Sequence, residues 1–373
     1  MPLGSEKPRE YQKPIAVEVL ERLKGLTDDY QSYETFKKVI DAIIAVAGDE
    51  PETLPWLKSL VEDEKDTILR FRKSYRIYGI TPNPLMQKIA QHYKSDPETL
   101  GWLKACIQLR QEALIKGAAV RAISSNYTES PETLPFLKAC LQHEDSLVQR
   151  SVVIGIAQHY QEDSDTLPWL KSCFQNLSGS LRYAVVSMIA DFYKKNPEIL
   201  PWLKSCLQDQ DWGVRMEAVE GIAEYYVEDP ETFTLVKSCL QDEHENVREA
   251  AVREIAECYR EDAETFLLLK SCAQFDQNYW VRDAALEALG EHWATEQGMF
   301  DLFYNCALND SSVREKDWQQ NSRQTALTIL LQYYYDNPRT LELLRDRAEN
   351  DPDEQLRQYA QEKLKKWENS QSF

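Results

Sequence analysis

Apolar residues along this chain recur at helical spacing, in two kinds of short segment that alternate. In the segment TLPFLKACL, Leu134, Leu137, Cys140 and Leu141 fall at i, i+3, i+6 and i+7, on one face of a helix. The second kind runs for thirteen positions, of which the fifth, sixth and ninth are apolar in every copy. Its copies start at Ile115, Val148, Leu181, Val214, Val247 and Val281. Both kinds predict amphipathic helices, and their alternation predicts helical hairpins.

The hairpins repeat along the chain. NPEILPWLKSC at Asn196 returns 33 residues later as DPETFTLVKSC at Asp229. An Asp, Asn or Ser followed by Pro favours a helix start, because its side chain caps free N–H groups and proline needs no donor there. A second proline, such as Pro135 or Pro168, stands four residues after the position at which most openings have their first proline. Either Thr is then the effective cap, or the first turn is distorted.

A hairpin of this size cannot bury its apolar faces alone, so the repeats must stack. The predicted fold is all-α, an α-α superhelix or solenoid of antiparallel helix pairs. We expect residues 1–14 to be a disordered lead-in or tag remnant, 15–49 a helical cap, and 50–368 about nine repeats. Insertions are expected near 63–95 and 311–321, and residues 369–373 form a tail.

Charge narrows the classes of partner. The chain has 62 acidic and 43 basic residues, a formal net charge of −19. This sign repels phosphate backbones, so neither nucleic acid nor an anionic membrane is the expected partner. No stretch approaches the ~20 apolar residues that span a bilayer. We expect a cytoplasmic protein.

Chemistry-bearing residues do not gather in a catalytic pattern. Seven of the eight cysteines recur every 33 or 34 residues, which predicts small packing residues rather than disulfides or zinc ligands. His92, His159 and His292 occupy a helical position that holds unrelated residues in other repeats. The pairs His143-Glu144 and His244-Glu245 lie in turns about three repeats apart and do not make a metal site. We therefore predict no catalytic residue, no cofactor and no metal.

An arginine column opens the second segments. It holds Arg182, Arg215, Arg248 and Arg282, each directly after an apolar residue. This two-helix repeat resembles the HEAT repeat, and the resemblance implies that the arginines form a ladder with acidic residues in the preceding turn. Asp209, Asp211, Asp242 and Glu243 are the suitable partners here. Lys116 and Gln149 depart from the pattern, so the ladder should be weak at the front of the array.

The closing stretch from Asn309 to Trp367, with the PETLPWLKSC openings, is similar to the C-terminal HEAT region of cyanobacterial NACHT proteins. These are signal-transducing NTPases, and the resemblance implies a sensing role. The chain contains no Gly-x-x-x-x-Gly-Lys-Ser/Thr phosphate loop. A NACHT NTPase would then act with it in cis or in trans.

The expected binding surface lies on the second helices, where the third and seventh positions vary between repeats and share one stripe. In HEAT-type arrays this side usually faces a partner. The candidate residues combine apolar, aromatic and arginine side chains, as interface hot spots do. At the third and seventh positions they are Ile154, Tyr183, Met216, Arg121, Arg150 and Arg253, and Phe192 and Tyr225 flank them at the twelfth position. The alternative is that some of them pack against neighbouring repeats.

The sequence thus predicts a non-enzymatic, protein-binding solenoid, the partner-recognition part of a NACHT-type signalling or defence system. The alternative is a HEAT-like phycobilin lyase, or a chaperone-like relative of one. A lyase needs a bilin-binding groove, and no basic cluster suited to propionates stands out.

Overall fold

The computed structural model describes residues 33–62, 84–109, 112–177, 179–312, 314 and 319–370. These residues form nineteen α-helices and one 3₁₀ helix, and the described part contains no strand. The all-α prediction is confirmed, and the fold is an α solenoid. The chain divides into two compact units, residues 1–192 (unit 1) and 193–373 (unit 2).

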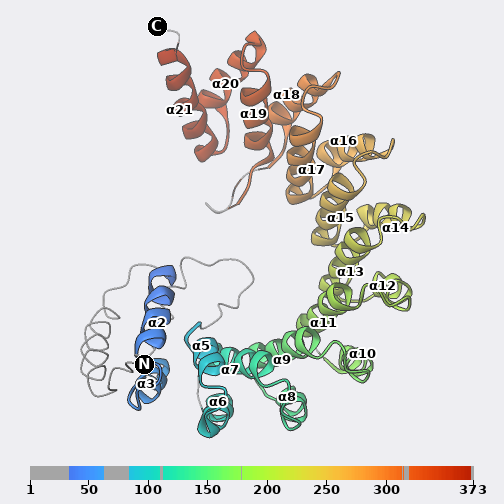
Figure 1. Cartoon of the computed structure of the whole chain (residues 1–373). Coiled ribbons are helices and arrows are strands. Elements are labelled where there is room, and N and C mark those ends of the chain that lie inside the picture. Colours follow the sequence, from blue (N-terminus) through green and yellow to red (C-terminus); the bar gives the residue numbers. More distant parts are fainter. Residues whose placement is uncertain are drawn as a thin grey trace, which may run out of the picture. The chain divides into compact units, whose positions relative to one another are not determined.

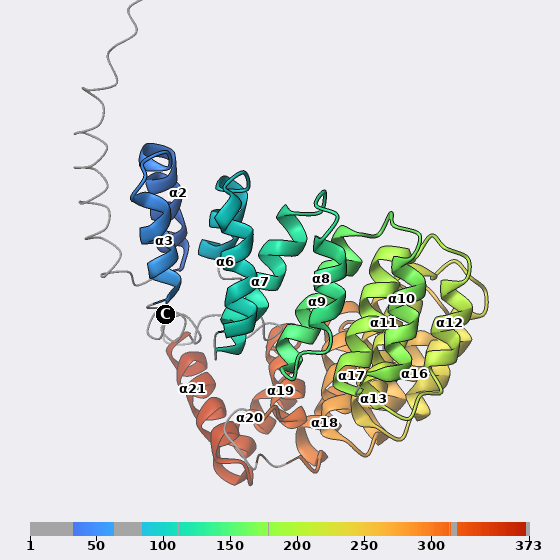
Figure 2. The ribbon, with the colours of Figure 1, turned by 90° about the horizontal axis from the view of Figure 1, so that it is seen from below.

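Unit 1 begins, in the described residues, with α2 (Tyr33–Ala47), which packs against α5. Its first helices are α3 (Thr53–Glu62), α6 (Pro97–Leu109), α8 (Thr133–Cys140) and α10 (Thr166–Asn176). Its second helices are α5 (Pro84–His92), α7 (Ala113–Asn126), α9 (Ser146–His159) and α11 (Gly179–Tyr193), whose last residue belongs to unit 2. The second helices α5, α7 and α9 pack against one another in sequence order. They form one layer, with α6 and α8 beside it (Figures 1 and 2).

Unit 2 repeats this arrangement. Its first helices are α12 (Ile199–Cys206), α14 (Thr232–Ser238) with η2 (Cys239–Gln241), α16 (Thr265–Phe275), α18 (Met299–Asn309) and α20 (Pro338–Asn350). Its second helices are α13 (Trp212–Tyr225), α15 (Glu245–Cys258), α17 (Tyr279–His292), α19 (Ser322–Tyr333) and α21 (Glu354–Ser370). The second helices from α13 to α19 again form a continuous layer, and α12, α14 and α16 lie along one side of it (Figure 1).

The predicted helix starts need one correction. In most repeats the Asp or Asn of the opening binds the N–H two residues on, as Asp229 does for Glu231, but the helix begins later, at Thr133, Thr166 or Thr232. Thr is therefore the first helical residue and not the cap. The second proline, such as Pro135, falls within the first turn, where a missing N–H costs nothing. Among the described first helices, α6 and α20 alone begin at the proline of the opening.

Side chains mark the start of five second helices, α9, α13, α15, α17 and α19. In each, an Asp, Asn or His side chain before the helix accepts the N–H two residues on, as Asp211 does from Gly213 at 2.9 Å, whereas α7 has no side-chain cap. The C-cap residue is aromatic, for example Tyr226 and Tyr259. The buried Thr265 at the next helix start donates to the Tyr259 carbonyl at 2.6 Å. These contacts fix the turn between one repeat and the next.

The core consists of the predicted apolar columns, with Ala218, Val219 and Ile222 fully buried. All eight cysteines are free thiols. Cys106, Cys173, Cys206, Cys239 and Cys306 are buried as predicted, whereas Cys140 and Cys272 are half-buried. Burial raises the pKa of Cys140 to about 11, so this thiol stays protonated at neutral pH.

Some predicted segments fall partly or wholly outside the described residues. These are 1–14, most of 15–49, the insertion at 63–83 and the last residues of the tail. The division into about nine repeats and the capping role of the N-terminal helices therefore stay predictions. The insertion near 311–321 lies between α18 and α19.

Candidate protein-interaction site

The eight candidate residues lie on second helices, five in unit 1 and three in unit 2. Arg253 is exposed, and the other seven are half-buried. Half-buried side chains fit neither alternative alone. They contact neighbouring helices, as packing residues do, and they also reach the surface, as partner-binding residues do.

In unit 1 the structure brings two of the candidates into direct contact. Nη1 of Arg150 on α9 donates to the Tyr183 hydroxyl on α11 at 2.9 Å. The guanidinium carbon lies 5.3 Å from the centroid of the Tyr183 ring. The pair orders both side chains before any partner arrives, which lowers the entropic cost of binding.

Two other candidates, Arg121 and Ile154, line a pocket of about 270 Å³ between α5, α7 and α9. Nη1 of Arg121 donates to Ser151 Oγ at 3.2 Å. Burial lowers the pKa of the Arg121 guanidinium to about 10. Burial also lowers the pKa of His159, another lining residue, so this imidazole is neutral at pH 7.

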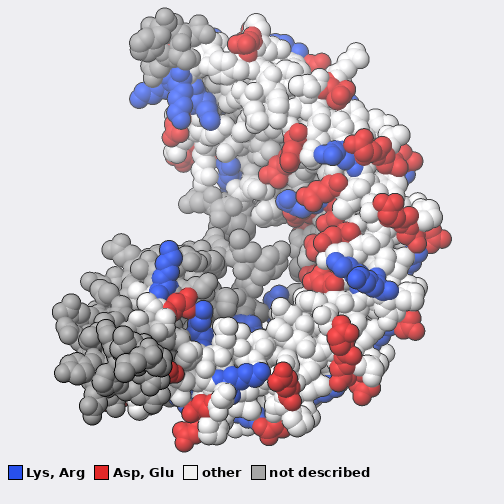
Figure 3. Space-filling view, viewed as in Figure 1, with Lys and Arg blue, Asp and Glu red and all other residues white. Residues whose placement is uncertain are grey.

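In unit 2 the second helices carry a cluster of carboxylates, seen as red atoms over α13 and α15 in Figure 3. Its members are Glu220 and Glu224 on α13, and Glu254 and Glu257 on α15. Burial, together with the charges of Glu220, Glu257 and Glu224, raises the pKa of Glu254 to about 7. Glu220 has a raised pKa for the same reason, first burial and then Glu224. Sequence patterning missed this cluster, although Glu220 stands at the variable seventh position of its segment.

The candidates of unit 2 lie beside these carboxylates in the same layer. Tyr225 holds the Lys194 ammonium 4.0 Å from its ring centroid. Arg253 pairs with Glu249 at 3.0 Å, one turn away, and with Glu287 on α17 at 3.9 Å. Two carboxylates, those of Glu249 and Glu287, thus surround the Arg253 guanidinium.

The arginine ladder is formed, but its partners differ from the prediction. Arg215 makes a two-pronged bond to the carboxylate of Asp242, at 2.7 Å for both contacts, and Asp242 lies in the turn that follows. The preceding turn supplies only a backbone carbonyl, that of Asp209, at 2.7 Å. Asp211 caps α13 instead of binding an arginine. A carboxylate in the next repeat joins two repeats, which one in the preceding turn would not do.

The same pattern continues along unit 2. Arg248 binds the carboxylate of Asp276, and Arg282 binds that of Asp310. Each arginine also donates to the carbonyl of the preceding aspartate, Arg248 to Asp242 at 3.0 Å and Arg282 to Asp276 at 2.8 Å. Arg182 in unit 1 differs, because its guanidinium carbon lies 4.5 Å from the Phe174 ring centroid. The ladder residues hold repeats together and are not available to a partner.

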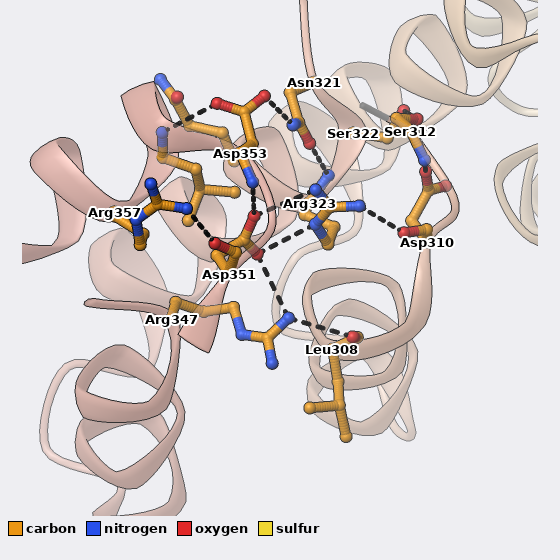
Figure 4. Close-up of polar contacts among 12 residues, drawn as sticks. Leu308, Asp310, Ser312, Asn321, Ser322, Arg323, Arg347, Asp351, Asp353 and Arg357 are labelled. Atoms are coloured by element: carbon orange, nitrogen blue, oxygen red, sulfur yellow. Dashed lines mark hydrogen bonds and ion pairs between the residues drawn. The ribbon is translucent and has the colours of Figure 1, made fainter. Parts of the chain in front are cut away.

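The closing motif of the sequence forms the end of this ladder (Figure 4). Arg323 binds both oxygens of Asp351 at 3.0 Å and the Asp310 carbonyl at 2.6 Å. Arg347 donates to the same carboxylate at 3.2 Å, and Arg357 donates to the Asp351 carbonyl at 2.6 Å. Arg323 and Asp351 are buried, so this motif has a structural role in holding α19, α20 and α21.

The insertion before α19 is attached to this network. Arg314 donates to Asp353 at 2.9 Å and to the Gln319 carbonyl at 2.7 Å. Asn321 caps α19 and donates to the other Asp353 oxygen at 2.7 Å. Both ends of the insertion are therefore fixed against the start of α21.

Sequence reasoning also missed several exposed apolar side chains and one buried charge. Phe275 is 76% exposed and Leu267 65%, both on α16. Asp283 on α17 is fully buried, and neither of its carboxylate oxygens makes a hydrogen bond of good geometry. Asp283 stands at the variable third position of its segment, so the apolar columns gave no sign of its burial.

The histidines of the pairs His143-Glu144 and His244-Glu245 have structural roles. His143 accepts the Asp145 N–H at 2.9 Å, and His244 caps α15. Among the described residues, no three His, Cys, Asp or Glu side chains lie together so that they could hold a metal ion. Nor does any helix in the described ranges have the length and apolar character to cross a membrane.

Comparison with known proteins gives a family match for part of the chain. A model of HEAT repeats matches residues 167–256 and 232–317. No curated protein sequence matches. Among 57 matching chains of solved structures, UNC-45 from Drosophila melanogaster shares 12% identity and a TM-score of 0.36. The alignment covers 89% of this chain and 54% of UNC-45, so the chain spans about half the length of that protein. Residues 167–317 of this α solenoid are thus similar to HEAT repeats.

Proposed function

We propose that this protein is a non-enzymatic, protein-binding solenoid that contacts its partner through the layer of second helices. One observation carries the proposal. Glu220, Glu224, Glu254 and Glu257 gather on α13 and α15, where their mutual repulsion and burial raise the pKa of Glu254 to about 7. Such a cluster costs stability, and perturbed carboxylates of this kind are enriched at functional surfaces.

The rest of the surface supports the choice of this layer. The turns hold the arginine ladder, and the first helices carry contacts that join repeats, such as Lys204 to Glu231 at 2.8 Å. The second helices present side chains that differ from repeat to repeat, including the Arg150–Tyr183 pair. A partner with complementary charge would relieve the repulsion among the glutamates.

The finer proposal is that this partner belongs to a NACHT-type signalling or defence system in the cytoplasm. The resemblance of the closing stretch, Asn309 to Trp367, to the HEAT region of cyanobacterial NACHT proteins supports it. The solenoid would then recognise a ligand, and a NACHT NTPase in cis or in trans would transmit the signal.

The test is affinity capture from host lysate, with and without phage challenge, followed by mass spectrometry. The test variant combines Glu220→Gln with Glu254→Gln. Its matched control combines Glu162→Gln with Glu228→Gln, which removes the same charge from exposed turn residues. We expect an NTPase or a phage protein to be captured by the wild type and the control but lost by the test variant. Retention of the same proteins by all three would contradict the proposed surface.

A second variant tests the predicted aromatic residues. Tyr183→Ser with Met216→Ser should weaken capture and leave the folding transition in place, because both side chains are only half-buried. Loss of the transition would show that they belong to the core. The lyase alternative predicts another result, a change in bilin absorbance on mixing with the protein and capture of phycobiliprotein subunits.

A further inference from the structure

A pocket of about 380 Å³ lies between the neighbouring second helices α17 and α19 of unit 2 (Figure 1). Two carboxylates line it from α17, those of Glu287 and Glu291, and both side chains are exposed. The neutral polar side chains of α19 in the pocket are Gln324, Thr325, Thr328 and Gln332. Among the lining residues that the structure describes there is no lysine or arginine. The pocket therefore offers negative charge and hydrogen-bond acceptors.

Two arginines approach the pocket, but each has a closer carboxylate partner outside it. Arg253 on α15 lies 3.9 Å from Glu287, and its shorter ion pair, at 3.0 Å, is with another acid. Arg314 donates to the Gln324 side chain at 2.8 Å and is paired with the carboxylate that precedes α21. Glu291 makes no ion pair within the described part of the chain. The α17 side of the pocket thus keeps an excess of negative charge.

A third carboxylate lies behind the pocket. Asp283 stands one turn before Glu287 on α17 and is fully buried, with neither oxygen in a hydrogen bond of good geometry. The hydroxyl that comes near it is that of Thr325, a lining residue, so the carboxylate is directed toward α19 and the inner wall of the pocket. The pKa of Asp283, raised mainly by burial, is about 6, so this group is charged at pH 7.5. A cation in the pocket would offset the cost of that buried charge.

The floor of the pocket is apolar. A Cβ at Gly290 would lie 2.7 Å from Cδ1 of Ile329, so the glycine allows α17 and α19 to approach closely at this point. Ile329 is 7% exposed, whereas the Tyr333 ring, one turn further along α19, is 39% exposed. Such a surface suits the methylene groups of a long charged side chain, and an aromatic ring also attracts a cation.

We propose that the pocket between α17 and α19 binds one cationic side chain of the partner protein, a lysine or an arginine. Its charged group lies at Glu287 and Glu291, where carboxylate oxygens accept charged hydrogen bonds, and its methylene groups lie along Ile329 and Tyr333. The inference rests on the proposed function for the existence of a protein partner, and it adds the chemistry of one contact.

The test uses the full chain at pH 7.5 and four probes. Three are peptides, acetyl-Gly-Gly-X-Gly-Gly-amide with X lysine, arginine or glutamine, and the fourth is spermidine, a free polyamine. Binding is followed by NMR titration of the Ile329 δ1-methyl signal, which is assigned with Ile329→Val. We expect the lysine or the arginine peptide to bind saturably and more tightly than the glutamine peptide, with an affinity that falls as salt is added.

Variants locate the site. Glu291→Gln should reduce the affinity for the charged peptide by about tenfold, since a charged hydrogen-bond acceptor is lost. The matched control is Glu296→Gln, which removes the same charge from an exposed turn residue that does not line the pocket, and it should bind as the wild type does.

Asp283→Asn provides a second measurement. It removes the charge behind the pocket and should weaken peptide binding by about threefold. Because this substitution relieves a buried charge, the variant should fold at least as well as the wild type. The test therefore remains decisive even if Glu291→Gln folds poorly.

Three results would overturn the inference. They are absence of a saturable Ile329 shift with both charged peptides, equal binding by the wild type and Glu291→Gln, and a glutamine peptide that binds as tightly as the charged ones. A shift with spermidine alone belongs to the first of these and would indicate a site for free polyamines. None of these results would change the outcome of affinity capture through Glu220 and Glu254. The proposed function can therefore stand or fall separately.

Discussion

At the scale of single residues, Asp283 is the least expected feature of unit 2. Burial is the largest of the causes that raise the pKa of this carboxyl to about 6, and the charges of Glu287 and Asp310 act in the same direction. The nearby Thr325 hydroxyl and the charge of Arg253 act against the shift. A buried acid of this kind is neutral in mild acid and costs stability when it ionises.

The stability of unit 2 should therefore depend on Asp283 and on pH. The folded pKa lies above the usual 3.8, so the folded state binds more protons between about pH 4 and 6, and stability falls as pH rises through that window. Asp283→Asn should remove this slope and raise the free energy of unfolding at pH 7.5 by about 2 kcal/mol. Urea unfolding at pH 4.5 and 7.5 measures both effects. Equal or lower stability of the variant at pH 7.5 would contradict this account.

At the scale of elements, helix-to-helix distance in unit 1 depends on small residues. Gly155→Ala places a methyl group 2.5 Å from Ser124 Oγ and 2.8 Å from its Cβ, so α7 and α9 must separate. We expect a loss of about 1–3 kcal/mol, even though alanine favours a helix.

Gly101→Ala on α6 is the matched control, because a Cβ there meets nothing within 4 Å. It should stabilise the protein by up to about 1 kcal/mol. Chemical denaturation of both variants gives the comparison, and a stabilising effect of Gly155→Ala would show that the helices have room to spare.

The ladder makes a second prediction at this scale. Arg248→Ala removes the guanidinium that binds both oxygens of the Asp276 carboxylate, a side chain only 9% exposed. The buried ion pair that links the two repeats is then lost. A loss of about 3–5 kcal/mol is expected, as for other broken buried ion pairs. Arg253→Gln breaks only exposed pairs and should cost less than about 1 kcal/mol in the same unfolding experiment. Similar losses of unfolding free energy in the two variants would contradict the stabilising role of the Arg248–Asp276 ion pair.

The helix pairs could be predicted because apolar period and turn residues are local properties of the sequence. The partner of Arg215 could not, since Asp242 is 27 residues away and an acidic residue closer in sequence looked equally suitable. The Arg121 pocket also escaped prediction, because it depends on the approach of three helices at Gly117 and Gly155. Arg121 and Ile154 were identified as surface candidates, without the cavity that they share.

At the scale of the molecule, the contacts that join neighbouring repeats differ between unit 1 and unit 2. In the first described repeats of unit 1, Lys116 and Gln149 stand at the ladder position. Nζ of Lys116 lies 3.4 Å from Nε2 of His143, and Nε2 of Gln149 donates to the Leu141 carbonyl at 3.0 Å. In unit 2 the same position holds arginines with two-pronged carboxylate partners. The repeats of unit 2 are therefore linked more strongly.

Hydrogen exchange should detect this difference. Amides of α15 and α17 should open with a higher free energy than those of α7 and α9, because local opening must break the buried ion pairs. Native-state exchange measured by mass spectrometry gives the order directly. Faster exchange in α15 than in α9 would show that apolar packing, not the ladder, sets local stability.

The ladder of unit 2 has one more property. Each of Asp242, Asp276 and Asp310 binds the arginine before it through its carboxylate and the arginine after it through its carbonyl. Every repeat thus carries both halves of the joint that it needs, one at each end. A tandem duplication of such a repeat would create a correct new interface at once, and a deletion would restore the old one. In evolutionary terms, this stretch of the gene can change length by whole repeats without inventing a new contact.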